Sequence, residues 1–152
     1  MKTNLLTTIK AAAETAGYKF MYGDGRYFER SISQIDLTDG SIGLMLNITA
    51  VQGTMFNDMW TGELVYDVQL FLFRKFEMTT ISSVAETMEQ KFEARIDELQ
   101  TELLRFISTL TQCNNEIDLI NPRYTIGTNV TAANADGWFL DCQLRLSNQY
   151  PT

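Results

Sequence analysis

The sequence predicts an α+β fold: a single domain, residues 1–152, in which a mostly antiparallel sheet packs against an N-terminal helix and one long central helix. Three observations support this prediction. From Gly62 to Phe76, two sets of side chains alternate with the period of a strand. From Ile81 to Thr111, apolar residues recur every three or four positions, which is the period of one helix face. Short connections link the other strand patterns, and strands linked in this way usually pair antiparallel.

The first predicted element is a helix from Asn4 to Ala16, because leucine, isoleucine and alanine form an apolar stripe along it. Thr3 or Asn4 can cap the free amide groups at its start, and Gly17 is a residue type at which helices commonly end. A short strand with an aromatic residue at every second position is predicted from Tyr18 to Tyr22.

The middle of the chain contains one further strand before the long one. An irregular segment is expected from Arg26 to Thr38, where the isoleucines do not alternate with polar residues. Ser41 to Ala50 alternates clearly and is predicted as a strand, and Val51 to Thr61 is predicted as a loop. Because the strands are half polar, one face of the sheet is expected to carry the helices and the other to stay open.

The end of the chain is predicted to form a hairpin. Asn114 and Asn115 end the helical pattern, and Pro122 disfavours its continuation. The two predicted strands run from Arg123 to Thr131 and from Gly137 to Ser147, with a turn between them. The chain shows no internal repeats, linkers or low-complexity stretches, which supports a single domain.

The composition argues against several classes of function. A net charge of −7 provides no basic surface for clamping a nucleic-acid backbone, and its simplest role is solubility. Histidine is absent, which removes the commonest general base and metal ligand. We therefore expect no catalytic residues, no cofactor and no metal site. Paired carboxylates can act without histidine, so a hydrolase stays open as an alternative.

Cys113 and Cys142 are the only cysteines, too few for a four-ligand zinc site or a disulfide framework. Cys142 belongs to the inward-facing set of the last strand, so we predict a buried reduced thiol, with a disulfide between the two cysteines as the alternative. The N-terminus lacks the unbroken apolar core of a signal peptide, and no stretch approaches the ~20 apolar residues of a membrane span. We expect a protein that folds in the cytoplasm without a membrane partner.

Two short motifs are better explained as turns than as binding sites. Residues 23–26, Gly-Asp-Gly-Arg, lack the Lys-Ser/Thr pair of a phosphate-binding loop, and no helix start follows them. Asp24, Asp36 and Asp39 do not have the spacing of a calcium-binding EF-hand loop. Serine and threonine side chains have no histidine to activate them as nucleophiles.

The predicted loop from Val51 to Thr61 contains four large apolar side chains, which is unusual because loops lie at the surface. They are Met55, Phe56, Met59 and Trp60. One interpretation is that they fold back over the core. The other is that they form a subunit interface, since aromatic residues and methionine are enriched in interface cores. We take the interface as the functional hypothesis.

An acidic stripe lies on the predicted central helix. Four acidic residues three or four positions apart share one face: Glu86, Glu89, Glu93 and Asp97. Lys91 and Arg95 lie on another part of the helix surface and relieve the repulsion only partly. The stripe is either a solvated face or the lining of a conduit through which a polyanion passes without binding.

The order of elements resembles the tail-terminator and head-to-tail joining proteins that form neck rings in tailed bacteriophages, especially small members from phages of gut Bacteroidetes. The resemblance is carried by Asn4–Gly23, Glu63–Phe76 and Ser83–Leu110, followed in order by the C-terminal strands. It covers most of the chain and rests on topology and hydrophobic pattern. It implies a subunit of a six- or twelve-fold ring that encloses the DNA conduit and has no catalytic residues.

We therefore expect a non-enzymatic virion protein of the neck or tail, made in the cytoplasm of the bacterial host. Its expected partners are further copies of itself and the adjacent portal, neck and tail proteins, with DNA passing through unbound. The alternative function is a monomeric or dimeric α+β domain that binds a small ligand. Its pocket would be lined by the aromatic residues Tyr18, Phe20, Tyr22, Trp60 and Trp138.

Overall fold

The computed structural model describes residues 4–23, 37, 41–75, 96–113, 117–130 and 135–150. Two helices and five strands follow one another along these residues. Their bounds are α1 Leu5–Thr15, β1 Lys19–Tyr22, β2 Gly43–Phe56, β3 Met59–Lys75, α4 Asp97–Cys113, β4 Ile117–Val130 and β5 Ala135–Leu146.

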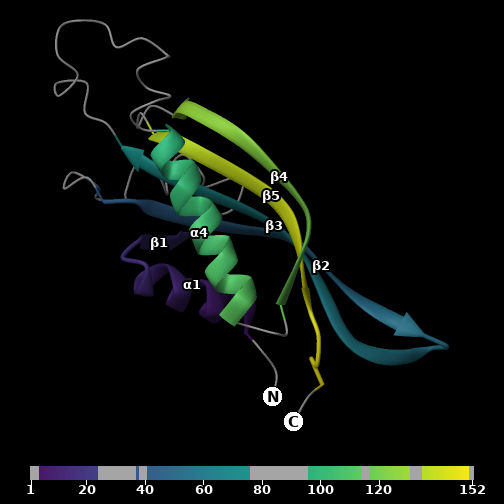
Figure 1. The fold of residues 1–152 in the computed structure, drawn as a ribbon. Coiled ribbons are helices and arrows are strands. Elements are labelled where there is room, and N and C mark those ends of the chain that lie inside the picture. Colours follow the sequence, from purple (N-terminus) through teal and green to yellow (C-terminus); the bar gives the residue numbers. More distant parts are fainter. Residues whose placement is uncertain are drawn as a thin grey trace, which may run out of the picture.

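The strands form one sheet in the order β1-β2-β3-β5-β4, and both helices lie on the same face of it (Figure 1). Every neighbouring pair is antiparallel except β1 and β2, which run parallel. A parallel pair needs a long connection, and here the chain between Tyr22 and Gly43 provides one. The predicted α+β class with a mostly antiparallel sheet is confirmed.

The N-terminal helix α1 begins and ends at the residues that its local signals predict. The Asn4 side chain accepts a hydrogen bond of 3.1 Å from the Thr7 amide, which satisfies one of the free donors of the first turn. The buried side of α1 consists of Leu5, Ile9 and Ala13. Gly17 follows with a φ of +84°, the left-handed conformation that commonly ends a helix.

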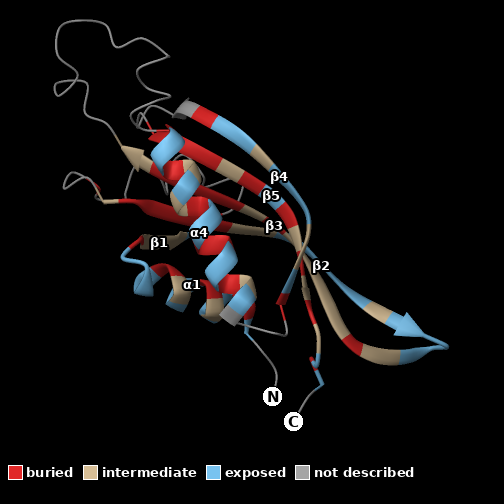
Figure 2. Ribbon diagram, in the orientation of Figure 1, coloured by how far each residue is buried: buried red, intermediate tan, exposed pale blue. Residues whose placement is uncertain are grey.

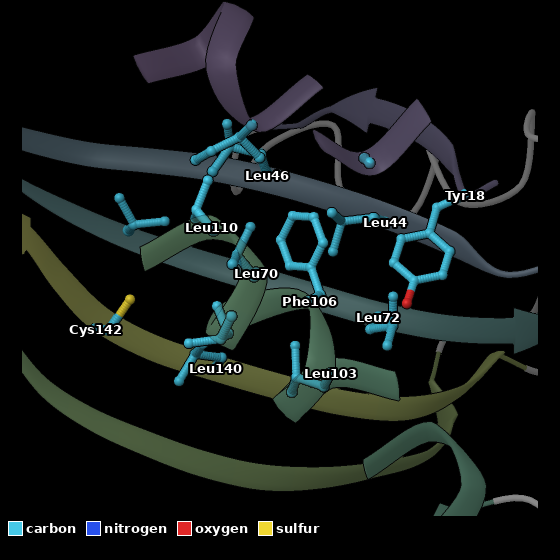
Figure 3. Close-up of a cluster of buried hydrophobic side chains, with 14 of the residues drawn as sticks. Tyr18, Leu44, Leu46, Leu70, Leu72, Leu103, Phe106, Leu110, Leu140 and Cys142 are labelled. Carbon is cyan, nitrogen blue, oxygen red and sulfur yellow. The ribbon is translucent and has the colours of Figure 1, made fainter. Parts of the chain in front are cut away.

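The main hydrophobic core lies between the helices and the sheet. Figure 3 shows Leu103, Phe106 and Leu110 of α4 lying over the leucines of β2, β3 and β5. The strand side chains that face the helices occupy alternate positions, as predicted for β2, β3 and β5. They include Leu44, Leu46, Leu70, Leu72, Leu140 and Leu144, all with no exposed surface. Burial of this apolar area is the main source of the fold's stability.

A second, smaller cluster lies on the opposite face of the sheet. Phe71 stacks on Phe139 of the neighbouring strand, with ring centroids 4.1 Å apart, and on Phe73 at 4.8 Å. Leu37 and Met45 are buried in the same cluster. The expectation of a fully open second face is therefore wrong at this end of the sheet, where aromatic packing removes the face from water.

The region predicted as a loop from Val51 to Thr61 is instead a β-hairpin, so that prediction is wrong. β2 continues to Phe56, two residues form the turn, and β3 begins at Met59. The turn residues Asn57 and Asp58 have φ values of 49° and 61°. Positive φ at both central positions defines the type I′ turn, whose twist matches that of paired strands. Asparagine and aspartate tolerate this conformation, so the Asn57-Asp58 pair is a hairpin signal within the sequence itself.

The central helix is confirmed from Asp97 to Thr111, and α4 continues to Cys113. The earlier part of the predicted helix and its junction with the long strand lie outside the described residues. So does the predicted irregular segment from Arg26 to Thr38, apart from Leu37. In the part of the chain that the structure describes, no helix has the length and apolar character needed to cross a membrane.

The predicted start of the first C-terminal strand is also wrong, because β4 begins at Ile117 and passes through Pro122. Ile120 pairs with Gln143 and Arg123 pairs with Asp141, so two residues of β4 oppose one residue of β5. This arrangement is a β-bulge on an edge strand, a position at which proline does not interrupt the ladder of hydrogen bonds. The predicted antiparallel pairing of the last two strands is confirmed.

Candidate interaction surfaces

The β2–β3 hairpin forms an arm, residues 50–63, that extends beyond the rest of the sheet and away from both helices (Figure 1). β1 pairs with β2 only from Gly43 to Leu46. On the other side, the pairing of β3 with β5 ends at Leu64 and Leu146. The two arm strands therefore pair only with each other among the described strands. An isolated two-stranded ribbon is at best marginally stable in water.

The arm ends in an apolar patch, the arm tip, formed by Met55, Phe56 and Met59. Their side chains are 60%, 72% and 71% exposed, the highest values among the large apolar residues of the described chain. Figure 2 shows the end of the arm as exposed. Trp60 is half-buried, and its indole ring lies over Gly53, where an added Cβ would come within 2.7 Å of the ring.

The arm-tip side chains belong to neither hydrophobic cluster of the described residues. The interpretation that the apolar residues of this region fold back over the core is therefore not what the structure shows. It places them at the end of a projecting element instead. Sequence reasoning identified the residues, and only the hairpin geometry shows how far they lie from the core.

The base of the arm is held in place by the last residues of the described chain. The amide of Gln149 donates a 2.7 Å hydrogen bond to the carbonyl oxygen of Gly62. The Tyr150 ring lies directly on Gly62, where an added Cβ would overlap the ring. Within the arm, the Thr61 hydroxyl donates to the Thr54 carbonyl at 2.9 Å. These contacts limit the directions in which the arm can point.

Two β-bulges lie at one level of the sheet, just before the arm. The bulge of β2 follows Ile48, which pairs with Val68, and Val68 pairs with Cys142 of β5. The bulge of β4 lies opposite Cys142. Bulges bend a strand and increase its twist. The sheet curves strongly in this region in Figure 1, and this curvature directs the arm away from the helices.

The open part of the second sheet face carries a polar ladder. The Gln69 amide donates to Asp141 at 3.1 Å, and the Gln143 amide donates to Asp67 at 2.9 Å. The shallow hollow over these residues has a volume of about 360 Å³. Each of the two carboxylates already accepts a hydrogen bond from a glutamine side-chain amide. Across the described ranges, no group of three or more histidine, cysteine, aspartate and glutamate side chains is placed to hold a metal ion.

A deeper hollow of about 530 Å³ lies between α1 and α4, and we call it the groove. Its floor is apolar and consists of Tyr18, Phe106 and Leu110, each at most 6% exposed. Small side chains of α1 form one wall, and polar side chains of α4 form the other. The wall residues are Ala12, Thr15, Ala16, Glu102, Arg105 and Thr109.

One polar network lies at the edge of the groove. The Tyr18 hydroxyl donates a 2.8 Å hydrogen bond to the Glu102 carboxylate, and Arg105 donates to the same carboxylate at 2.9 Å. Burial, followed by the hydrogen bond and charge of Glu102, raises the pKa of Tyr18 well above its usual value. Tyr18 therefore stays a neutral donor at physiological pH, and the carboxylate remains bound between two donors.

The aromatic residues expected to line a common pocket do not gather in the structure. Tyr18 lines the groove, whereas the Trp138 indole is buried in the core and donates to the carbonyl of Ile96 at 2.8 Å. Trp60 lies in the arm, and Tyr22 is half exposed at the end of β1. Phe20 packs against the main core. Their separation could not be seen in the sequence, because it depends on which strands become neighbours.

Of the predicted acidic stripe, only Asp97 lies within the described residues. It is the exposed first residue of α4, where its negative charge is favourable next to the free amide groups of the helix start. Glu86, Glu89 and Glu93 lie outside the described residues.

Cys142 is a free, buried thiol, which confirms the prediction made for it. Burial, followed by the neighbouring charge of Asp141, raises its pKa to about 12. A thiol with so high a pKa is not a nucleophile at neutral pH, so its role is packing.

No family model matches this chain, and no curated protein matches it with significant similarity. Inferences about its function therefore rest on the geometry of the arm, the groove and the polar ladder.

Proposed function

We propose that this chain is a structural, non-enzymatic subunit of a ring in the neck or tail of a tailed bacteriophage. The ring would enclose the DNA conduit and contact the adjacent portal, neck or tail proteins. The observation that supports this proposal best is the arm. It projects from a well-packed domain, and its end carries the most exposed large apolar side chains among the described residues.

The arm has the properties of an assembly element. Its strands have no further strand partner among the described residues, and unpaired strand edges readily pair with or dock onto another chain. Phenylalanine and methionine are typical of the buried centre of interfaces. An arm whose base is held by the Gln149 and Tyr150 contacts is ordered before it binds, which lowers the entropic cost of association.

The charge of the chain is compatible with a DNA conduit. A net charge of −7, repeated in every subunit, would make the ring strongly acidic and keep it from binding DNA. In the proposed ring, the stripe that includes Asp97 faces the conduit. Glu86, Glu89 and Glu93 are the other members of that stripe, and a map of the ring with these side chains on its outside would refute their assignment.

The mass of the purified protein in solution, with negative-stain imaging, tests the proposal. We expect a closed ring of several subunits. Phe56→Ser should lower the assembled fraction and leave the circular dichroism spectrum unchanged, because Phe56 is 72% exposed. Leu104→Ser, at a 48% exposed position on α4, is the matched control and should leave assembly intact. A protein that stays monomeric and joins no larger particle would contradict the ring.

The groove favours a second candidate function, the binding of a small apolar ligand by a monomer or dimer. Its volume of about 530 Å³ falls within the ~300–1,000 Å³ that is typical of ligand pockets. A screen of small molecules by thermal shift separates the two functions. A compound that raises the Tm of a monomeric protein, but not the Tm of the Ala16→Trp variant, would support the ligand-binding function.

A further inference from the structure

We propose that the arm tip of one copy inserts into the groove between α1 and α4 of the next copy. This inference rests on the proposed ring function and names the contact that would build the ring. It joins two different surfaces of the same chain: the arm tip, whose large apolar residues are the most exposed in the described part of the chain, and the hollow between the helices.

The arm tip and the groove match in chemistry. Phe56 and Met59 pair with each other across the type I′ turn, and Met55, the residue before Phe56, pairs with Trp60 and places its side chain on the other face of the ribbon. Methionine is unbranched and flexible, so it adapts to an irregular cavity. The rings of Tyr18 and Phe106 form the floor but are nearly buried, so most of the surface that the methionines would contact belongs to the groove walls, which include Ala12 and Ala16.

The groove is open because small side chains line one of its walls. Ala12, Thr15 and Ala16 leave the hollow between α1 and α4 where larger residues would fill it. Tyr18 and Phe106 at its floor belong to the main hydrophobic core and are only 6% and 3% exposed, so the hollow lies above a closed core and between the two walls. Large apolar side chains that enter the hollow would therefore be removed from water on several sides, which is the main source of binding energy.

The charges near the two surfaces are complementary. Asp58, in the turn of the arm, is the only ionisable residue between Val51 and Gly62. Arg105, at the groove, has a 66% exposed side chain, and one of its nitrogens is bonded to Glu102. A guanidinium has five N–H donors, so Arg105 can bind Asp58 of a neighbour and keep its bond to Glu102. This pairing would orient the tip more than it adds to affinity.

The arrangement in the fold makes this a contact between copies. The arm points away from α1 and α4, so a chain does not fill its own groove (Figure 1). A contact between two different surfaces of identical chains is heterologous, and repeated contacts of this kind close into a ring when the rotation between copies allows it. The proposed contact is therefore of the heterologous type that a closed ring of identical subunits requires.

Mixing two complementary variants tests the inference. Phe56→Asp places a charge at the centre of the arm tip and prevents its insertion into an apolar site, and Ala16→Trp fills the groove at an exposed position. Each variant alone should be a monomer of 17.3 kDa, because each lacks one half of the contact. The equimolar mixture should show a dimer of twice that mass, since one intact tip and one intact groove remain. Leu104→Asp is the matched control and should assemble as the unmodified protein does.

The possible outcomes test the proposed contact and the proposed ring independently. If the unmodified protein forms rings and both variants also form rings, the contact is wrong and the ring stands. If the two folded variants stay monomeric when mixed, the contact is also wrong. Thr109→Trp, on the opposite wall, replaces Ala16→Trp if that variant does not fold. If the unmodified protein is itself monomeric at every concentration, both the contact and the proposed function are refuted.

Discussion

Replacing Gly137 with alanine is expected to destabilise the fold by about 3 kcal/mol, because β3 and β5 approach too closely there for a side chain. An added Cβ at Gly137 would lie 2.7 Å from the Cα of Phe73, and Cβ atoms in proteins essentially never come closer than 3.0 Å to a heavy atom of this kind. It would also overlap the carbonyl oxygen of Leu72. All of these atoms belong to the backbone, so no side chain can rotate away to make room. The central strand β3 and its neighbour β5 must separate instead.

The magnitude follows from what that separation breaks. Gly137 pairs with Phe73, and each backbone hydrogen bond lost around this pair costs about 0.5–1.5 kcal/mol. Overpacking of a buried site adds about 1–3 kcal/mol. Alanine also lowers the conformational entropy of the unfolded chain, which offsets about 0.4–1 kcal/mol of this loss of stability. The neighbouring residue Trp138, whose indole donates a hydrogen bond to the carbonyl of Ile96 just before α4, would move with the strand.

Urea unfolding followed by tryptophan fluorescence measures this cost. Gly17→Ala is the matched control, because an added Cβ there meets no atom within 4 Å and the φ of +84° alone costs about 1–2 kcal/mol. The expected order is therefore a larger loss for Gly137→Ala than for Gly17→Ala. An equal or smaller loss would refute the close approach of β3 and β5.

Three further predictions concern a buried aromatic residue, the buried thiol and an ion pair at the surface. Phe71→Ala should cost about 3–5 kcal/mol in urea unfolding, because Phe71 is fully buried, and Phe56→Ala should cost less than about 0.5 kcal/mol. The pKa of Cys142 is raised to about 12 in the fold, so the contribution of the neutral thiol to stability is complete below pH 9 and is lost as pH rises toward 12. In the unmodified protein Tm should therefore fall over this range, and Cys142→Ala should make the fall less steep. The same dependence of Tm on pH in both proteins would contradict the burial of the thiol. Hydrogen bonding to Arg74 lowers the pKa of Glu98, so this pair should stabilise the fold above about pH 4.5 and cease to do so as pH falls further. Glu98→Gln should therefore remove about 0.2–1 kcal/mol near neutral pH and less in acid, and an equal loss at both pH values would exclude the ion pair.

Much of the secondary structure was predictable because its signals are local. The start of α1 depends on the Asn4 side chain and a nearby amide, and its end depends on Gly17. The alternation along β3 and the helical period of α4 are likewise properties of a short stretch of chain. The errors arose where a turn or bulge changes the pattern without ending the strand. Asn57-Asp58 and Asn121-Pro122 both do this.

The surfaces could be predicted only in part. The apolar residues of the arm tip were visible in the sequence as an unusual cluster. The groove was not visible, because it forms between Tyr18 and residues of α4 that follow more than eighty positions later. Small residues such as Ala12 and Ala16 look like ordinary helix formers until another helix is placed beside them.

The sequence by itself determined the α+β class, the order of the described elements and the side chains that face the core, since these follow from periodicity along the chain. Only the tertiary structure decided that β1 lies parallel to β2, that aromatic residues cover part of the second face, and that the apolar segment is an arm. It also decided that a groove lies between the helices. These features depend on contacts between distant segments, and such contacts are set by how the whole chain packs rather than by any local pattern.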